Sequence, residues 1–130
     1  MEIKGKNIIV TGAAGGIGSC LVRKLLQMDA TVAAVDWDKK KLDFLKNDCA
    51  EASHKLVCYC GDVGDFNFVQ SSTEDFFKRC TKIDALVNNA SILKDGTLVS
   101  IFKGKVQKFS LEDWNETITS NLNGYFYFAR

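Results

Sequence analysis

The chain has 130 residues, the length of one domain, and its 46% hydrophobic and 25% charged residues are ordinary for a globular protein. A net charge of +1 gives no long-range attraction to nucleic acid or to an anionic membrane, and we expect neither as a partner. No apolar stretch approaches the roughly 18 residues that span a bilayer, and the first residues lack the layout of a signal peptide. The sequence therefore predicts a single domain over residues 1–130.

The cysteines indicate a reducing compartment. There are five, an odd number, which fits a cytoplasmic protein better than a disulfide framework. Cys58 and Cys60 form the closest pair, but a C-x-C pair without further ligands is a poor metal signal, so we expect no metal and interpret both as core residues. His54 is interpreted as a surface-loop residue, and the basic run at 39–41 as the solvated first turn of a helix.

Short apolar runs alternate with stretches of helical spacing over the first 87 residues. The runs at 8–10, 31–35, 56–59 and 83–87 predict strands. The apolar faces of the helices between them are predicted to be Ile17, Leu21, Leu25 and Met28, then Leu42, Leu45 and Cys49, then Val69, Thr73, Phe76, Phe77 and Cys80. Such alternation requires parallel strands with right-handed crossovers, so we predict an α/β fold with a Rossmann-type doubly wound parallel sheet.

Residues 98–109 interrupt this alternation. Two short runs around Lys103-Gly104 predict a β-hairpin, and Ser110 marks the start of a long last helix. The buried face of that helix is predicted to be Leu111, Trp114, Ile118, Leu122, Tyr125 and Ala129. The pattern is still helical at Arg130, so we expect the fold to be truncated after the fourth strand and its following helix.

A glycine-rich loop separates the first predicted strand from the first predicted helix. Free N–H groups and a partial positive charge at a helix start suit a pyrophosphate, and glycines let the backbone approach it closely. We therefore expect a dinucleotide at Gly12, Gly15, Gly16, Ile17 and Gly18. No Gly-Lys-Ser/Thr follows, which disfavours a nucleoside-triphosphate loop.

Asp36 ends the second predicted strand, close to the roughly 20 residues past the glycines at which a ribose-binding carboxylate is found. Its charge would repel the 2′-phosphate of NADP, and neither Gly15 nor Trp37 is a basic residue that would neutralise it. NAD is therefore the predicted cofactor, with NADP less favoured. The alternative interpretation is an exposed aspartate that caps the next helix.

Together these residues resemble the classical short-chain dehydrogenase/reductase family. The family's Thr-Gly-x-x-x-Gly-x-Gly pattern is matched over 11–18, its adenine-contacting pair by Asp62-Val63, and its Asn-Asn-Ala-Gly element by Asn88-Asn89-Ala90. Asn121 matches the asparagine of the family's catalytic tetrad. Two features depart from the pattern: Ser91 replaces a glycine, and Gly15 beside Gly16 also fits the extended, epimerase-like branch.

The resemblance implies cofactor contacts at Asp62, Val63, Asn89 and Ala90, and a catalytic role for Asn121. It also implies hydride transfer between a nicotinamide and a carbonyl or alcohol substrate, as in 3-oxoacyl-carrier-protein reductase-like members, and a homo-oligomer. In the family the remaining catalytic serine, tyrosine and lysine lie on later elements, so this chain alone is expected to be inactive, supplying the cofactor-binding half of a parent enzyme. The alternatives are a non-catalytic dinucleotide-binding or protein-interaction module and, for Asn121, a helix residue with local hydrogen bonds.

Overall fold

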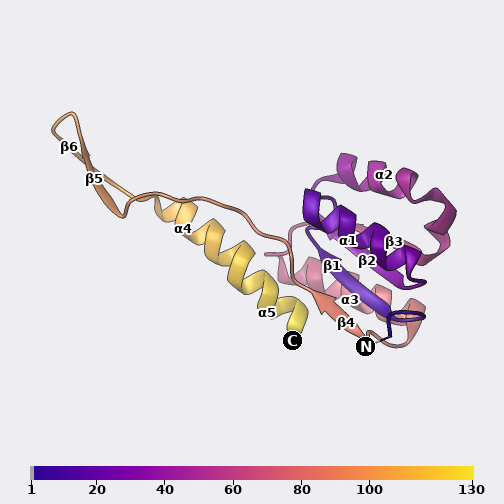
Figure 1. Ribbon diagram of the computed structural model, residues 1–130. Helices are drawn as coiled ribbons and strands as arrows, with labels where there is room; N and C mark the ends of the chain where they lie inside the picture. The colour runs from indigo at the N-terminus through magenta and orange to yellow at the C-terminus, as the bar shows by residue number, and fades with distance from the viewer. Residues whose placement is uncertain (1) are drawn as a thin grey trace.

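A parallel sheet forms the centre of the computed structural model, which describes residues 2–130 (Figure 1). The strand order is β3-β2-β1-β4, which places the first strand inside the sheet. Ile8 of β1 lies opposite Val32 of β2 and Ala85 of β4. The predicted doubly wound parallel sheet is confirmed, with strands β1 (Asn7–Thr11), β2 (Thr31–Asp36), β3 (Leu56–Cys60) and β4 (Ala85–Val87).

Helices cover both faces of this sheet. One hydrophobic cluster joins Val10 of β1 to α1 (Gly16–Gln27) and α2 (Lys39–Asp48). The cluster on the opposite face joins Ile9 of β1 to α3 (Phe66–Cys80) and to the last helix of the chain. Because neighbouring residues of a strand point to opposite faces, β1 serves both clusters and is buried on both sides.

The predicted inner face of α2 is confirmed at Leu42, Leu45 and Cys49, all of them buried. For α1 the prediction is wrong at both ends: Ile17 is 78% exposed and Met28 is also exposed, and the buried residues are Gly18, Val22, Leu25 and Leu26. In α3 the prediction is wrong for Phe77, which is exposed beside the fully buried Phe76. Adjacent helical residues differ by about 100° around the axis, so only one of two neighbouring aromatic residues can face the sheet.

The predicted hairpin is present as β5 (Val99–Phe102) and β6 (Lys105–Lys108), an antiparallel pair that extends away from the sheet (Figure 1). Lys103 and Gly104 form its turn with φ of 50° and 73°. Positive φ at both central residues is the requirement of the tight turn that matches the twist of two antiparallel strands.

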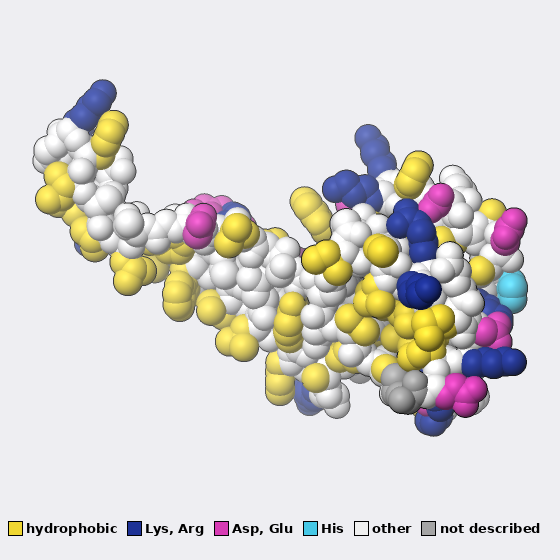
Figure 2. All heavy atoms as spheres, in the orientation of Figure 1, with side chains coloured by type: hydrophobic (Ala, Val, Ile, Leu, Met, Phe, Trp, Pro, Cys, Tyr) yellow, Lys and Arg dark blue, Asp and Glu magenta, His cyan; other side chains and the backbone are white. Residues whose placement is uncertain are grey.

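The last helix is interrupted, and its predicted buried face is wrong at Leu111, Trp114, Leu122 and Ala129, which are exposed, while Ile118 and Tyr125 are half-buried. A turn of π-helix, η2 (Thr119–Asn123), separates α4 (Leu111–Ile118) from α5 (Gly124–Ala129). Trp114 is 52% exposed, Leu111 and Leu122 are exposed further still, and hydrophobic side chains appear along this arm in Figure 2. The buried residues are Gly124 and Phe128, because the wider π turn rotates α5 relative to α4 and only α5 packs against α3 and the sheet.

The cysteines and His54 differ in how far they are exposed. All five cysteines are free; Cys58 is half-buried, and Cys60 is exposed at the end of β3, so its prediction as a core residue is wrong. His54 is exposed on a short 3₁₀ helix, η1 (Ala50–Lys55).

Within residues 2–130 no three His, Cys, Asp or Glu side chains gather in a way that would hold a metal ion. The helices of this same range are all too short or too polar to cross a bilayer.

Candidate functional site

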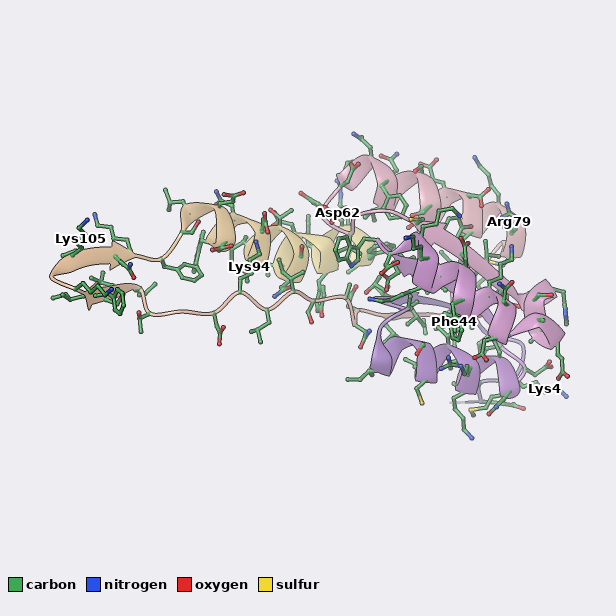
Figure 3. The ribbon with its side chains drawn as sticks, turned by 90° about the horizontal axis from the view of Figure 1, so that it is seen from above. Lys4, Phe44, Asp62, Arg79, Lys94 and Lys105 are labelled. Atoms are coloured by element: carbon green, nitrogen blue, oxygen red, sulfur yellow. The ribbon has the colours of Figure 1, made fainter. Side chains whose placement is uncertain are left out.

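A cleft of about 930 Å³ opens at the carboxyl ends of the strands and continues along α4. Figure 3 shows Asp62 near the junction of the sheet with the α4 arm, and Lys94 further out along the arm. The lining contains every residue for which a cofactor contact was predicted: Gly12, Gly15, Gly16, Ile17, Gly18, Asp36, Asp62, Val63, Asn89 and Ala90. Ligands of open parallel sheets bind at this edge.

The structural constraints on the glycines of the loop differ from one position to the next. Gly12 has a φ of +61°, and a Cβ there would lie 2.8 Å from the Cα of Ala90, so both backbone conformation and space require glycine. A Cβ on Gly18 would collide with the carbonyl of Gly12. A Cβ on Gly16, by contrast, would meet no atom within 4 Å, because Gly16 faces the cleft.

The start of α1 has backbone N–H groups without a partner inside the helix. No side chain caps the helix at Gly15, and its first turn contains no acidic residue. Ser19 is the first helix residue whose N–H reaches back to a carbonyl, that of Gly15 at 2.9 Å. The N–H groups of the first turn, Gly16 to Gly18, therefore remain for a ligand in the cleft, and the helix dipole favours a negative one.

Thr11 and Asn89 fasten the glycine loop to the neighbouring strand end. The hydroxyl of the buried Thr11 accepts the N–H groups of Asn89 at 3.0 Å and of Ala90 at 3.1 Å. In return the side-chain amide of Asn89 donates to the carbonyls of Thr11 and Gly12, each at 3.1 Å. Thr11 belongs to the glycine motif of the sequence, and its place at the end of β1 is what brings its hydroxyl to the neighbouring strand end.

The carboxylate of Asp36 is fixed by two backbone amides. Its oxygens accept the N–H of Ala14 at 2.9 Å and of Asp38 at 3.0 Å, and the residue is only 6% exposed although it lines the cleft. The alternative of an exposed helix cap is wrong, because α2 is capped by Asp38, which accepts the N–H of Lys41 at 3.1 Å. That bond is the main reason why the pKa of Asp38 lies below its usual value.

Lys41 is a cleft residue that sequence reasoning missed. The prediction that residues 39–41 form the solvated first turn of a helix is confirmed, because all three are exposed at the start of α2. Lys41 also lines the cleft, and its ammonium lies 3.2 Å from the carboxylate of Asp38. Its sequence position could have indicated this place. Lys41 lies three residues after the capping Asp38, about one helical turn, so both residues lie on the same side of α2 near the end of β2.

Asp62 and Val63 follow the end of β3 and line the cleft there. One carboxylate oxygen of Asp62 accepts the N–H of Gly64 at 2.8 Å, and the side chain is exposed. Val63 is buried beneath the helical arm: a Cβ on Gly124 would lie 3.0 Å from the side chain of Val63. The close approach of α5 to Val63 therefore depends on a glycine.

Asn121 lies in the π turn and holds the segment that follows β4. Its side-chain oxygen accepts the N–H of Ile92 and its amide donates to the carbonyl of Ile92, both at 2.9 Å. Ile92 is 29 residues away in the chain, so the alternative of a helix residue with only local hydrogen bonds is wrong. Ile92 lines the cleft, and Asn121 is not among the lining residues.

A salt bridge at the outer end of the cleft was also missed. The ammonium of Lys94 lies 2.8 Å from a carboxylate oxygen of Asp113 and also contacts Glu116, both on α4. These two carboxylates raise the pKa of Lys94. Because Lys94 and Glu116 line the cleft, this cluster holds the segment after β4 against α4 and shapes the cleft wall.

Comparison with known proteins identifies the family. The family model for short chain dehydrogenases matches residues 6–130, so the chain belongs to that family. It is 35% identical over 126 residues to the 3-oxoacyl-acyl-carrier-protein reductase of Thermotoga maritima, covering 97% of this chain and 48% of that protein. It is 31% identical over 128 residues to the 2,3-dihydro-2,3-dihydroxybenzoate dehydrogenase of Bacillus subtilis, covering 98% of this chain and 46% of that protein.

Solved structures share the same fold. The 3-ketoacyl-acyl-carrier-protein reductase of Brucella melitensis, crystallised with NADH, aligns with a TM-score of 0.80 at 23% identity over 98% of this chain and 48% of that one. The chain spans about half the length of the curated relatives it matches. The predicted family, Rossmann-type fold and extent relative to full-length members are thereby confirmed.

Proposed function

We propose that this chain is the cofactor-binding half of an NAD-dependent oxidoreductase that transfers hydride between the nicotinamide and a carbonyl or alcohol carbon. One observation carries the proposal: the uncapped start of α1 and the carboxylate of Asp36 line the same cleft. An anion-binding helix start beside a carboxylate suits a molecule that has both a pyrophosphate and a ribose with free hydroxyls.

The residues around the cleft fit such a ligand. The open space at Gly16 leaves room for a phosphate against the first-turn N–H groups of α1. Each oxygen of Asp36 accepts one backbone N–H and retains a lone pair, so the carboxylate can also accept the hydroxyls of a ribose. The backbone amides of Ala14 and Asp38 hold the Asp36 carboxylate in place before any ligand binds, which lowers the entropic cost of binding.

Charge supports NAD over NADP. A 2′-phosphate would stand beside the Asp36 carboxylate, and Lys41, a lysine of the cleft lining, is already paired with Asp38. The bound nicotinamide would supply the hydride acceptor or donor.

The catalytic part of the proposal concerns a parent protein. Asn121 fixes Ile92 at the cleft and serves there as a positioning residue. Residues 1–130 contain no tyrosine followed by lysine four places later, so we propose that this polypeptide alone binds cofactor without turnover. The small-molecule carbonyl or alcohol substrate, the homo-oligomer and the cytoplasmic location stay predictions.

Calorimetric titration with NAD and NADP tests the proposal. The chain should bind NAD more tightly than NADP, and Asp36→Ala should weaken NAD more than NADP, because only NAD loses a favourable contact. Asp43→Ala is the matched control, since Asp43 is an exposed aspartate of α2 paired with Lys39 outside the cleft. Absence of NAD binding, or an equal loss for both cofactors with Asp36→Ala, would contradict the proposal.

A further inference from the structure

We propose that the hairpin of β5 and β6 binds the surface of an anionic lipid membrane, with its apolar side chains among the lipid headgroups and its lysines against the lipid phosphates. The hairpin lies outside the cleft lining, so this inference goes beyond the proposed function and is independent of it. Figure 1 shows the hairpin projecting beyond α4, away from the sheet. A flat surface can therefore reach it without meeting the rest of the molecule.

The hairpin exposes large apolar side chains. Val99, Ile101 and Val106 share one face, because Ile101 lies opposite Val106 and alternate residues of a strand point to the same side. All three are mostly exposed, Ile101 at 76%, and Phe102 near the turn is exposed on the other face. A two-stranded hairpin with no support on an apolar face is only marginally stable in water, so a contact that buries these side chains would stabilise it.

The hairpin is also strongly basic. It contains Lys103, Lys105 and Lys108, and residues 96–111 include no aspartate or glutamate. None of these lysines takes part in a salt bridge within residues 2–130. Figure 3 shows Lys105 at the far end of the arm, and Figure 2 shows basic and hydrophobic side chains side by side there. The expectation of no membrane partner was based on the whole-chain charge of +1, which conceals this local concentration.

The arrangement of these side chains suits lipid better than a second copy or another protein. Unpaired lysines on both strands repel a second hairpin and prevent pairing at the strand edges. Apolar and cationic residues alternate around the turn, from Ile101 to Val106, so a protein would need acidic and apolar groups interleaved in the matching order. An anionic bilayer offers phosphate and hydrocarbon within the length of one side chain, and a lysine stem can reach the phosphates while its neighbours lie deeper.

The base of the hairpin is held in place. The N–H of Phe109 donates to the carbonyl of Leu98 at 3.0 Å, and the ring of Phe109 lies so close to Gly96 that a Cβ there would be 3.3 Å from it. The salt bridges of Lys94 to α4 fix the segment that leads into the hairpin. The hairpin is thus presented in one orientation, which lowers the entropic cost of binding a surface.

Sedimentation with lipid vesicles tests the charge part of the proposal. The chain should sediment with vesicles of phosphatidylcholine and phosphatidylglycerol but not with phosphatidylcholine alone, and high salt should weaken the binding. Lys103→Gln combined with Lys105→Gln should weaken it about 30-fold, from roughly fivefold for each lysine. Lys24→Gln combined with Lys40→Gln removes the same charge from exposed positions of α1 and α2 and should leave the affinity nearly unchanged.

A second pair of variants tests the apolar part. Ile101→Ser should weaken vesicle binding about tenfold, whereas Phe44→Ser, at an exposed position of α2, should not change it. Circular dichroism should show the same melting temperature for both variants, because neither side chain is buried.

Three outcomes would overturn the proposal. The first is the absence of binding to the anionic vesicles, and the second is an equal loss for the two lysine pairs. The third is binding to polyglutamate without binding to vesicles, which would identify an acidic protein as the partner of the hairpin.

Discussion

The hydroxyl of Thr11 and the backbone of Asn89 join β1 to the segment after β4 through a 3.0 Å hydrogen bond, and the side chain of Asn89 returns to the carbonyl of Thr11 at 3.1 Å. Two strand ends that are 78 residues apart in the chain are thereby locked side by side. The glycine loop begins at this junction, so its shape depends on a contact that lies beneath the cleft.

Thr11→Val should therefore lower stability although it preserves shape. Valine leaves the partly buried N–H groups of Asn89 and Ala90 without their acceptor, which costs about 1–3 kcal/mol of unfolding free energy. Urea unfolding followed by circular dichroism measures the loss. Thr31→Val is the control, because the Thr31 hydroxyl makes no hydrogen bond in the described part of the chain, and it should change the stability by less than about 0.5 kcal/mol. Equal losses for the two variants would show that the Thr11 junction has no special role.

Gly16→Ala should separate folding from binding. The added methyl meets no protein atom within 4 Å, and alanine is the better helix former, so the melting temperature should stay equal or rise. The same methyl enters the space proposed for a phosphate, so NAD affinity measured by calorimetry should fall at least about tenfold, or 1.4 kcal/mol.

Gly12→Ala gives the opposite pattern. With φ at +61° and the Cα of Ala90 at 2.8 Å from the new Cβ, it should reduce the melting temperature itself. If the Gly16→Ala chain binds NAD as tightly as the unmodified chain, the proposed position of the phosphate at the start of α1 is wrong.

The parallel sheet and the cleft follow from local signals. Apolar runs of strand length alternate with helical spacing, and Gly12 to Gly18 with Asp36 mark the edge where a ligand binds. Side-chain orientation is less predictable: Ile17 fits a helical apolar stripe but faces the cleft, because it lies in the first turn where α1 is open. Periodicity defines a stripe and leaves its ends undetermined.

Other features depend on distant contacts that a local pattern does not contain. No sequence pattern predicted the π turn at Thr119–Asn123. This turn forms where Asn121 makes hydrogen bonds with Ile92 and where Gly124 lies close to Val63. The cluster of Lys94 with Asp113 and Glu116 likewise requires the path of the segment after β4. Such contacts become visible only when the chain is folded.

Asn121→Ala should loosen the segment after β4. The backbone of Ile92 loses both partners, so its amide should exchange with deuterium several-fold faster, as expected for the loss of hydrogen bonds worth about 1 kcal/mol each. Hydrogen exchange followed by mass spectrometry measures this on a peptide spanning Ile92. Asn123→Ala, in the same π turn, is the control and should leave that exchange unchanged, since no hydrogen bond joins Asn123 to Ile92. Faster exchange in both variants would mean that the turn as a whole, rather than the Asn121 carboxamide, holds the segment.

Asp84, just before β4, should make the stability depend on acid pH. Its carboxylate lies 2.7 Å from the ammonium of Lys82 and 3.5 Å from that of Lys6, and it accepts the N–H of Asn7 at 3.0 Å. Lys82 foremost, then the Asn7 amide, lowers the pKa of Asp84 to about 2. The ordinary value is about 3.9, so the ionised carboxylate stabilises the fold fully above that pH, and the contribution disappears as the pH falls toward 2.

Asp84→Asn removes this charge and nearly preserves shape. Its melting temperature should lie below that of the unmodified chain near about pH 6, and the difference should shrink steadily between about pH 4 and pH 2, where Asp84 itself becomes protonated. Asp43→Asn, which breaks only an exposed ion pair with Lys39, should change the melting temperature little at any of these pH values. A difference for Asp84→Asn that stays constant down to pH 2 would mean that the loss comes from packing or hydrogen bonding alone, and that the lysines around Asp84 do not stabilise the fold.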